Sequence, residues 1–183
     1  MKLFAEKGFR GTTTREIAAA VGVSEPVLYE HFKTKRDIYS AIIDCTINAG
    51  TPLLEAFRDK HIHSHDDRAF FSELASLLFG WYSKDPTFIR LLLFSNLENH
   101  EMRDLFHQRM SGQFFGLIAD YIERRVAEGG FRRVDPTIAA RGFAGMIANY
   151  ALTGIVFGCP LPASNEEIIH ELVGIYLEGL CTH

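Results

Sequence analysis

A run of polar and aromatic side chains near the N-terminus carries the most specific chemistry of the 183-residue sequence. If a helix begins at Ser24, Leu28 and Phe32 lie four positions apart and point inward together. The remaining side chains then face outward, where they could meet phosphate oxygens or base edges in the major groove of DNA. These outward residues are Ser24, Glu25, Pro26, Val27, Tyr29, His31 and Lys33.

Two short helices and a tight turn would have to position this surface. Ile17, Ala18 and Val21 are spaced to share the inner face of a first helix. Gly22 permits the turn, and Val23 is expected to fill its corner. The pattern is typical of a DNA-reading helix-turn-helix, although it also occurs in proteins that never touch DNA.

Capping residues mark where these helices begin. Thr13 and Glu16 have the spacing of a capping box, and Ser24 can cap the second helix with its hydroxyl. Pro26 needs no donor at that position. Glu25 could accept from a cytosine amino group, but support of the helix dipole is the favoured interpretation.

Residues around the two helices could add phosphate contacts. Thr14 and Arg15 would lie exposed on the first turn of their helix, where phosphate contact and simple solvation are equally consistent with the sequence. Thr34 and Asp37 have the spacing to cap the next helix, which we expect to link two lobes. Lys35 lies at its start, where a phosphate is a plausible partner.

From Leu3 to Ile43 the sequence resembles the DNA-binding domain of the tetracycline-repressor (TetR) family of bacterial transcriptional regulators. The resembling stretch reads LFAEKGFRGTTTREIAAAVGVSEPVLYEHFKTKRDIYSAII. The resemblance implies an all-α protein, with a helix-turn-helix domain over residues 1–48 and a ligand-binding and dimerisation domain over residues 49–183. It also implies phosphate contact by Tyr29 and Lys35, and groove contact by residues 24–27 and His31. The first helix is shorter than is usual in the family.

Composition and charge agree with this assignment. Residues 1–48 hold seven Lys and Arg against six Asp and Glu, so they carry a slight positive charge within a chain of net charge −4. Three distant cysteines, and no signal peptide or membrane-length apolar run, favour the cytoplasm. We expect no cofactor.

Alternating histidines at positions 61, 63 and 65 raise the question of a metal site. No cysteine is nearby, and the spacing suits neither one helix face nor a zinc finger. We therefore expect a solvated loop from Asp59 to Asp67 and no metal.

Apolar residues beyond position 50 exceed the needs of a small helical core. They could be plain core, but together with the resemblance they favour a cavity for an apolar or aromatic effector, oriented by a few polar groups. The predicted lining is Leu74, Leu78, Trp81, Leu92, Met110, Gln113, Phe114, Phe143, Ile147, Asn149 and Tyr150.

The last third of the chain has features of a dimer interface. Small residues recur along a helix over residues 136–157, and the final helix carries two apolar stripes, which need two partners. A monomer that buries both stripes is the alternative. The predicted contacts are Ala144, Ala148, Ala151, Ile168, Leu172, Ile175 and Tyr176.

The sequence therefore predicts a homodimeric regulator, most simply a repressor, that leaves a palindromic operator when a small molecule binds. One alternative is a helical binding module without DNA-binding function, and another is an enzyme that uses the apolar cavity. No arrangement of nucleophile and base, phosphate loop or metal ligands has recognisable spacing, which disfavours the enzyme.

Overall fold

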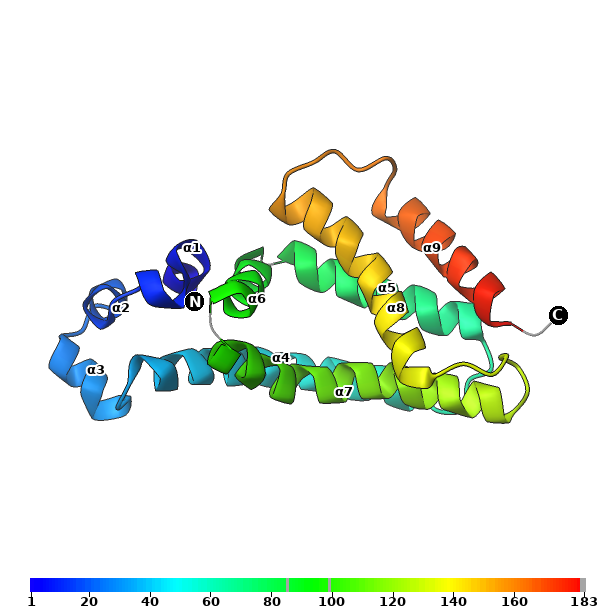
Figure 1. The fold of residues 1–183 in the computed structure, drawn as a ribbon, viewed down its shortest axis with the longest axis horizontal. Coiled ribbons are helices and arrows are strands. Elements are labelled where there is room, and N and C mark those ends of the chain that lie inside the picture. The colour runs from blue at the N-terminus through cyan, green and yellow to red at the C-terminus, as the bar shows by residue number, and fades with distance from the viewer. Residues whose placement is uncertain (85, 99, 182–183) are drawn as a thin grey trace. The chain divides into compact units, whose positions relative to one another are not determined.

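The computed structural model describes residues 1–84, 86–98 and 100–181, without the side chains of Lys84, Leu92, 95, 96, 98 and 100–111. These described residues form α-helices, one π-helical turn and no strand (Figure 1). The helices are α1 (Lys2–Gly11), α2 (Thr14–Val21), α3 (Glu25–His31), α4 (Lys35–His61), α5 (Asp67–Lys84), α6 (Pro86–Glu98), α7 (His100–Ala127), α8 (Pro136–Ala151), η1 (Leu152–Val156) and α9 (Asn165–Leu180).

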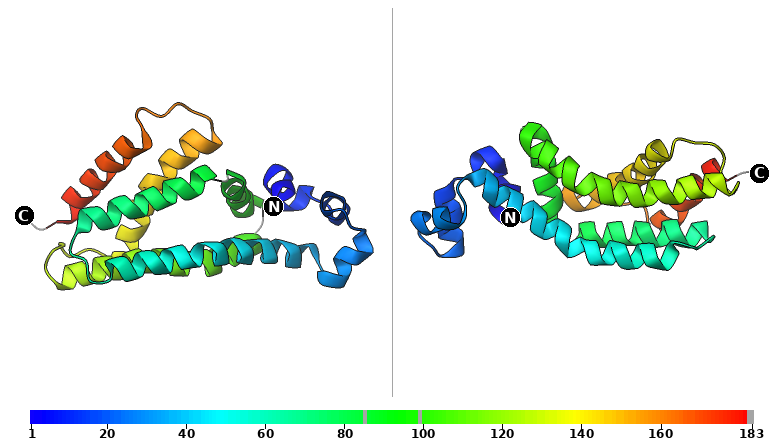
Figure 2. Two further views of the ribbon diagram at one scale, coloured as in Figure 1. Left: turned by 180° about the vertical axis from the view of Figure 1, so that it is seen from behind. Right: turned by 90° about the horizontal axis from the view of Figure 1, so that it is seen from below.

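The chain forms two compact units. The first unit comprises residues 1–51 and 87–110, and the second comprises residues 52–86 and 111–183. Helix α4 passes from one unit into the other without a break, although it contains Pro52 (Figure 2). The predicted domain boundary after residue 48 falls within this helix and stays a prediction. None of the described helices is both long and apolar enough to span a membrane.

An aromatic cluster forms the core of the first unit. The ring of Tyr39 meets those of Phe4 and Phe9 edge-on, with centroids 5.2 and 5.5 Å away. The Tyr39 hydroxyl also reaches the carbonyl of Leu91 in α6, at 3.5 Å. Helix α1 is kinked at Gly8, which has a φ of 71°, and continues to Gly11. This positive φ favours glycine.

A larger aromatic core fills the second unit, in which α5 packs against both α8 and α9 (Figure 1). Phe71 is fully buried and contacts the rings of Tyr121, Phe143 and Tyr176 at centroid distances of 5.8, 4.8 and 5.0 Å. Phe70 stacks on Tyr121 with centroids 3.6 Å apart. Burial of this much aromatic surface is the main source of the unit's stability.

An ion pair fastens α5 to the end of α7. The Asp67 carboxylate accepts from Arg125 at 2.8 and 3.1 Å and from the Tyr121 hydroxyl at 2.7 Å. Burial, together with this carboxylate, raises the pKa of Tyr121. Beyond α7, Gly129 adopts a φ of 79°, a left-handed conformation that ends the helix and favours glycine.

The loop predicted from Asp59 to Asp67 is shorter than expected, because α4 continues to His61. The imidazole is buried against Phe57, with centroids 4.6 Å apart, and its Nε2 lies 2.8 Å from a Glu73 oxygen. The prediction of a solvated His61 is therefore wrong, since packing on aromatic rings extends the helix. Among the described residues, no group of three His, Cys, Asp or Glu side chains could hold a metal ion.

Candidate functional site

The helix-turn-helix is positioned by local hydrogen bonds. The Thr13 side chain accepts from the Glu16 backbone N–H, and the Glu16 carboxylate accepts from the Thr13 N–H at 2.9 Å, which confirms the capping box. Gly22 has a φ of 75° and donates to Ala18 and Ala19, which confirms the predicted turn. Ser24 occupies the cap of α3 as expected, but its hydroxyl makes no capping hydrogen bond.

The inner face of this motif differs from the prediction at two valines. Ile17, Ala18 and Leu28 are buried as expected. Val21 is 63% exposed, because it is the last residue of α2 and the chain turns away at Gly22 without covering it. Val23 is also exposed and does not fill the corner.

A polar network joins the starts of α2 and α3. The Thr14 hydroxyl donates to Glu25 Oε1 at 2.5 Å, and the Tyr29 hydroxyl donates to Thr14 Oγ1 at 3.2 Å. Glu25 is half-buried, whereas Tyr29 and Val27 are exposed. The fold thus brings together three of the predicted DNA-contacting residues, and it gives Glu25 a partner that the sequence did not indicate.

The other predicted DNA contacts fall into two groups. Lys35 donates to the carbonyls of Phe9 and Thr12 at 2.6 and 2.7 Å, and its ammonium lies 4.5 Å from the Phe9 ring centroid. It thus ties the start of α4 to the segment between α1 and α2. The remaining predicted contacts are exposed, namely Arg15, Ser24, Pro26, His31 and Lys33.

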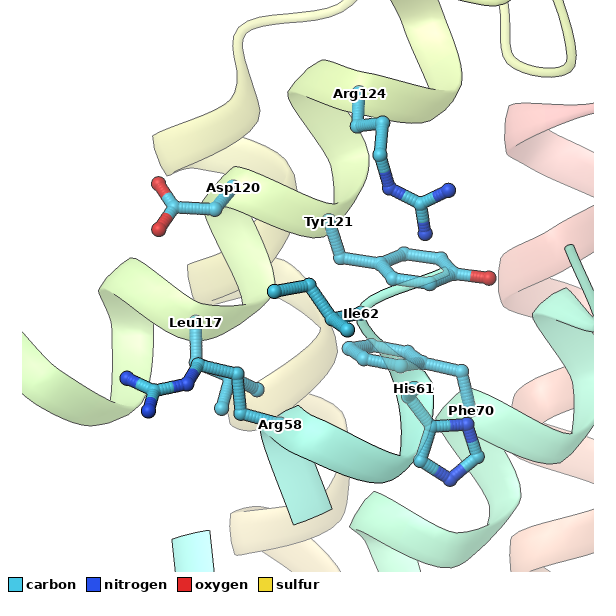
Figure 3. A pocket seen from close by; sticks show the side chains of 8 residues that line it. All are labelled: Arg58, His61, Ile62, Phe70, Leu117, Asp120, Tyr121 and Arg124. Carbon is cyan, nitrogen blue, oxygen red and sulfur yellow. The ribbon is translucent and has the colours of Figure 1, made fainter. Parts of the chain in front are cut away.

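A cavity of about 190 Å³ opens in the second unit, between α4, α5 and α7 (Figure 3). The stacked rings of Phe70 and Tyr121 form one wall, and the Arg124 guanidinium lies over the Tyr121 ring at 4.9 Å (Figure 3). The full lining is Arg58, His61, Ile62, Phe70, Leu117, Asp120, Tyr121 and Arg124.

The charged groups of this cavity differ in how firmly they are held. Arg124 donates to the Ser64 carbonyl at 2.9 Å and to Glu128 at 3.3 Å. Arg58 meets only Asp59 at 3.5 Å among the described residues, a long contact that leaves its guanidinium exposed. The cavity can therefore take an apolar body against its aromatic wall and an anionic group beside Arg58.

His61 also lines the cavity. Lys60 and then His61 lower the pKa of the Glu73 carboxyl that both of them contact. His61 Nδ1 is buried and has no hydrogen-bond partner among the described residues.

The structure does not assemble the predicted cavity residues around this space. Leu74, Leu78, Phe143 and Ile147 are buried in the core of the second unit, so close packing replaces the expected cavity there. Gln113 and Asn149 are exposed, while Trp81, Phe114 and Tyr150 are half-buried. The side chains of Leu92 and Met110 lie outside the described residues.

Sequence reasoning missed the observed cavity, although one signal for it exists. Leu117, Asp120, Tyr121 and Arg124 recur at the spacing of a single helix face, on which apolar and charged groups mix. The other walls come from residues 58–70, and nothing local in the sequence links the two regions.

The predicted dimer contacts are mostly covered by their own chain. Ala151, Ile168 and Leu172 are buried in the core of the second unit, and Ala144 is buried as well. Ala148 and Tyr176 are half-buried, and Ile175 is 61% exposed.

An apolar groove runs between α8 and α9 on the outer face of the second unit. Ile175 borders it together with Ile138, which is 72% exposed. Gly142 and Gly179 line it as well and would allow close approach of another helix. The groove encloses about 510 Å³.

Two family models match this chain. The model of bacterial regulatory proteins of the tetR family matches residues 1–42, and the model of the C-terminal domain of AefR-like transcriptional repressors matches residues 85–179. The transcriptional regulator YerO of Bacillus subtilis is 28% identical over 177 residues, which cover 92% of this chain and 57% of YerO. The chain thus spans little more than half the length of this relative.

Solved structures share the fold. FadR of Bacillus subtilis, in complex with stearoyl-CoA, aligns with a TM-score of 0.78 at 16% identity, over 99% of this chain and 94% of FadR. AibR, in complex with isovaleryl coenzyme A and operator DNA, aligns with a TM-score of 0.67 at 22% identity, over 94% of this chain and 91% of AibR. At these identities the likeness establishes the fold alone.

Proposed function

Because the chain belongs to the tetR family of bacterial regulatory proteins, we propose that it is a ligand-responsive transcriptional repressor. We propose that it is a cytoplasmic protein and that it binds operator DNA. The family is one of regulators rather than enzymes. The observation that carries the proposal is the surface formed by α2 and α3, where half-buried Thr14 and Glu25 and exposed Tyr29 are linked by hydrogen bonds. A helix-turn-helix reads the major groove with such residues.

Paired variants on this surface test the proposed reading mode. The Tyr29 hydroxyl donates to Thr14 in the free protein, and we propose that it turns to donate to a phosphate when DNA binds. Tyr29→Phe removes this hydroxyl, so it should weaken binding to specific and random duplexes alike. Val27→Ala removes an apolar contact proposed to lie against a base, so it should change which sequence is preferred. Fluorescence anisotropy with both duplexes measures the two effects. Equal losses on specific and random DNA for the Val27 variant would contradict this assignment.

The effector is proposed to enter the cavity between α4, α5 and α7. Arg58 and His61 belong to α4, the helix that Lys35 ties to the DNA-reading motif. A ligand that binds better to a position of α4 in which the protein cannot bind its operator would shift the population away from the DNA-binding state. Since two solved structures of this fold hold acyl-CoA, a short acyl-CoA with its apolar chain and anionic head is the first class to test.

Blocking the cavity separates effector binding from DNA binding. Ile62 is exposed at the rim, so Ile62→Trp can fill the space without disturbing the core. Isovaleryl-CoA should release operator DNA from the unmodified protein but not from this variant, while operator affinity without ligand stays unchanged. Leu53→Trp is the matched control, since Leu53 is exposed on α4 and lies outside the cavity, whereas Ile62 directly follows that helix. Release from all three proteins would place the effector elsewhere.

Dimerisation is proposed to use the groove between α8 and α9. Ile138 and Ile175 expose a large apolar surface there, which a second copy of the chain would cover around a two-fold axis. A dimer also matches the two half-sites of a palindromic operator. Ile175→Asp should give a monomer in light scattering, whereas Glu171→Gln on the same helix should stay dimeric.

A further inference from the structure

We propose that Glu25 determines specificity by selecting cytosine at one position in each half-site of the operator. The inference rests on the proposed DNA-binding function and adds the identity of the base that is read. The observation that supports it is the position of the Glu25 carboxylate. Thr14 holds this carboxylate at the DNA-reading surface through a hydrogen bond.

The hydrogen bond from Thr14 uses only one of the two carboxylate oxygens. Thr14 Oγ1 donates to Oε1, and the Thr14 oxygen in turn accepts from the Tyr29 hydroxyl. The carboxylate is therefore held by Thr14, whose oxygen is held in turn by Tyr29. Oε2 has no partner among the described residues, so it can accept a hydrogen bond from DNA.

The ionised Glu25 carboxylate can only accept hydrogen bonds, so it distinguishes the bases by the donors that they present in the major groove. Cytosine presents an amino group as its major-groove donor, which suits a carboxylate. Adenine places its amino group beside the N7 acceptor, so only one of its two groups suits a carboxylate, whereas guanine presents two acceptors, which repel it. Thymine offers an acceptor and a methyl group. Cytosine is thus the base that Glu25 favours.

A negative charge at this surface also limits binding to other sequences. The carboxylate lies near groups that approach phosphates, and it is compensated only where a base donor meets it. Glu25 should therefore raise the affinity for DNA that has cytosine at this position and lower the affinity for DNA that lacks it. If Glu25 only supported the helix dipole, it would create no base preference of its own.

Selection from a library of randomised duplexes tests the proposal. The unmodified protein should enrich cytosine at one position of each half-site, with about tenfold discrimination over the other bases. Glu25→Gln should reduce this preference or shift it to adenine, because glutamine pairs with the adenine amino group and N7. The other positions should keep their preferences. Glu30→Gln is the matched control, since Glu30 is an exposed acid on the same helix.

Thr14→Val separates positioning of the carboxylate from its presence. Valine keeps the shape of threonine but cannot donate to Glu25, so discrimination at the same position should fall while the preferences elsewhere stay. Circular dichroism establishes that each variant is folded. Such a fall in base preference is not expected from a purely structural role, which would lower affinity for all sequences together.

The possible results are distinct. An unchanged preference at every position in the Glu25→Gln variant, or specific binding without any cytosine preference in the unmodified protein, would overturn the role of Glu25 and leave the proposed function standing. No sequence preference in the unmodified, folded dimer would overturn both.

Discussion

The DNA-reading surface and the effector cavity are held by different kinds of contact. The reading surface depends largely on hydrogen bonds between residues close in the chain, such as those of Thr13 with Glu16 and of Gly22 with Ala18. The cavity depends on aromatic residues far apart, such as Phe70 and Tyr121. Locally held elements can open at low cost, whereas a packed core resists change. We therefore expect the reading head to deform more easily than the effector-binding unit.

The largest effect is expected in the aromatic core. Phe71→Ala leaves a cavity among Tyr121, Phe143 and Tyr176, and it should lower the free energy of unfolding by about 3–5 kcal/mol. Denaturant unfolding followed by circular dichroism measures the loss. A loss below 1 kcal/mol would mean that the second unit is not the rigid part of the molecule.

Breaking the long-range ion pair should have a smaller effect. Asp67→Asn removes the charge that pairs with Arg125 and weakens the acceptor of Tyr121, so the free energy of unfolding should fall by about 2 kcal/mol. The same denaturation experiment reports it. Asp59→Asn is the control, because Asp59 is exposed. Asp66→Asn is unsuitable, because the Asp66 carboxylate accepts a hydrogen bond from the Ala69 N–H.

Loss of the Thr13 cap of α2 should lower the free energy of unfolding by less than either of these changes. Thr13→Ala removes the acceptor for the Glu16 N–H and should cost about 1 kcal/mol. Amide hydrogen exchange should show the loss in α2 and not in α5. Equal loss of protection in both helices would argue against separately held units.

The smallest effect is a pH dependence of the first unit. Lys7 and then Thr13 lower the pKa of Glu16 to about 2, below its ordinary 4.5. The stability that ionised Glu16 provides is therefore present above about pH 4.5 and is lost as the pH falls toward 2. Thermal unfolding of the native protein and Glu16→Gln should differ at pH 5 and converge near pH 2. A constant difference would contradict the linkage.

The same contrast explains what the sequence could predict. The capping box, the Gly22 turn and the helices depend on neighbours within about four residues, so their spacing predicted them. The observed cavity joins residues 58–70 to 117–124, and periodicity does not say which helix faces another. For the same reason Ile168 and Leu172, although correctly placed on an apolar stripe, proved to belong to the core of their own chain.

Titration of the purified protein with DNA flanking its own gene tests the central claim most directly. Anisotropy at two salt concentrations, with random duplex as competitor, separates specific from general attraction. Saturable binding by a dimer, resistant to the competitor and weakened by salt, is the predicted result. Binding no tighter than to random DNA, by protein shown to be folded and dimeric, would contradict it and favour a helical binding module without DNA-binding function.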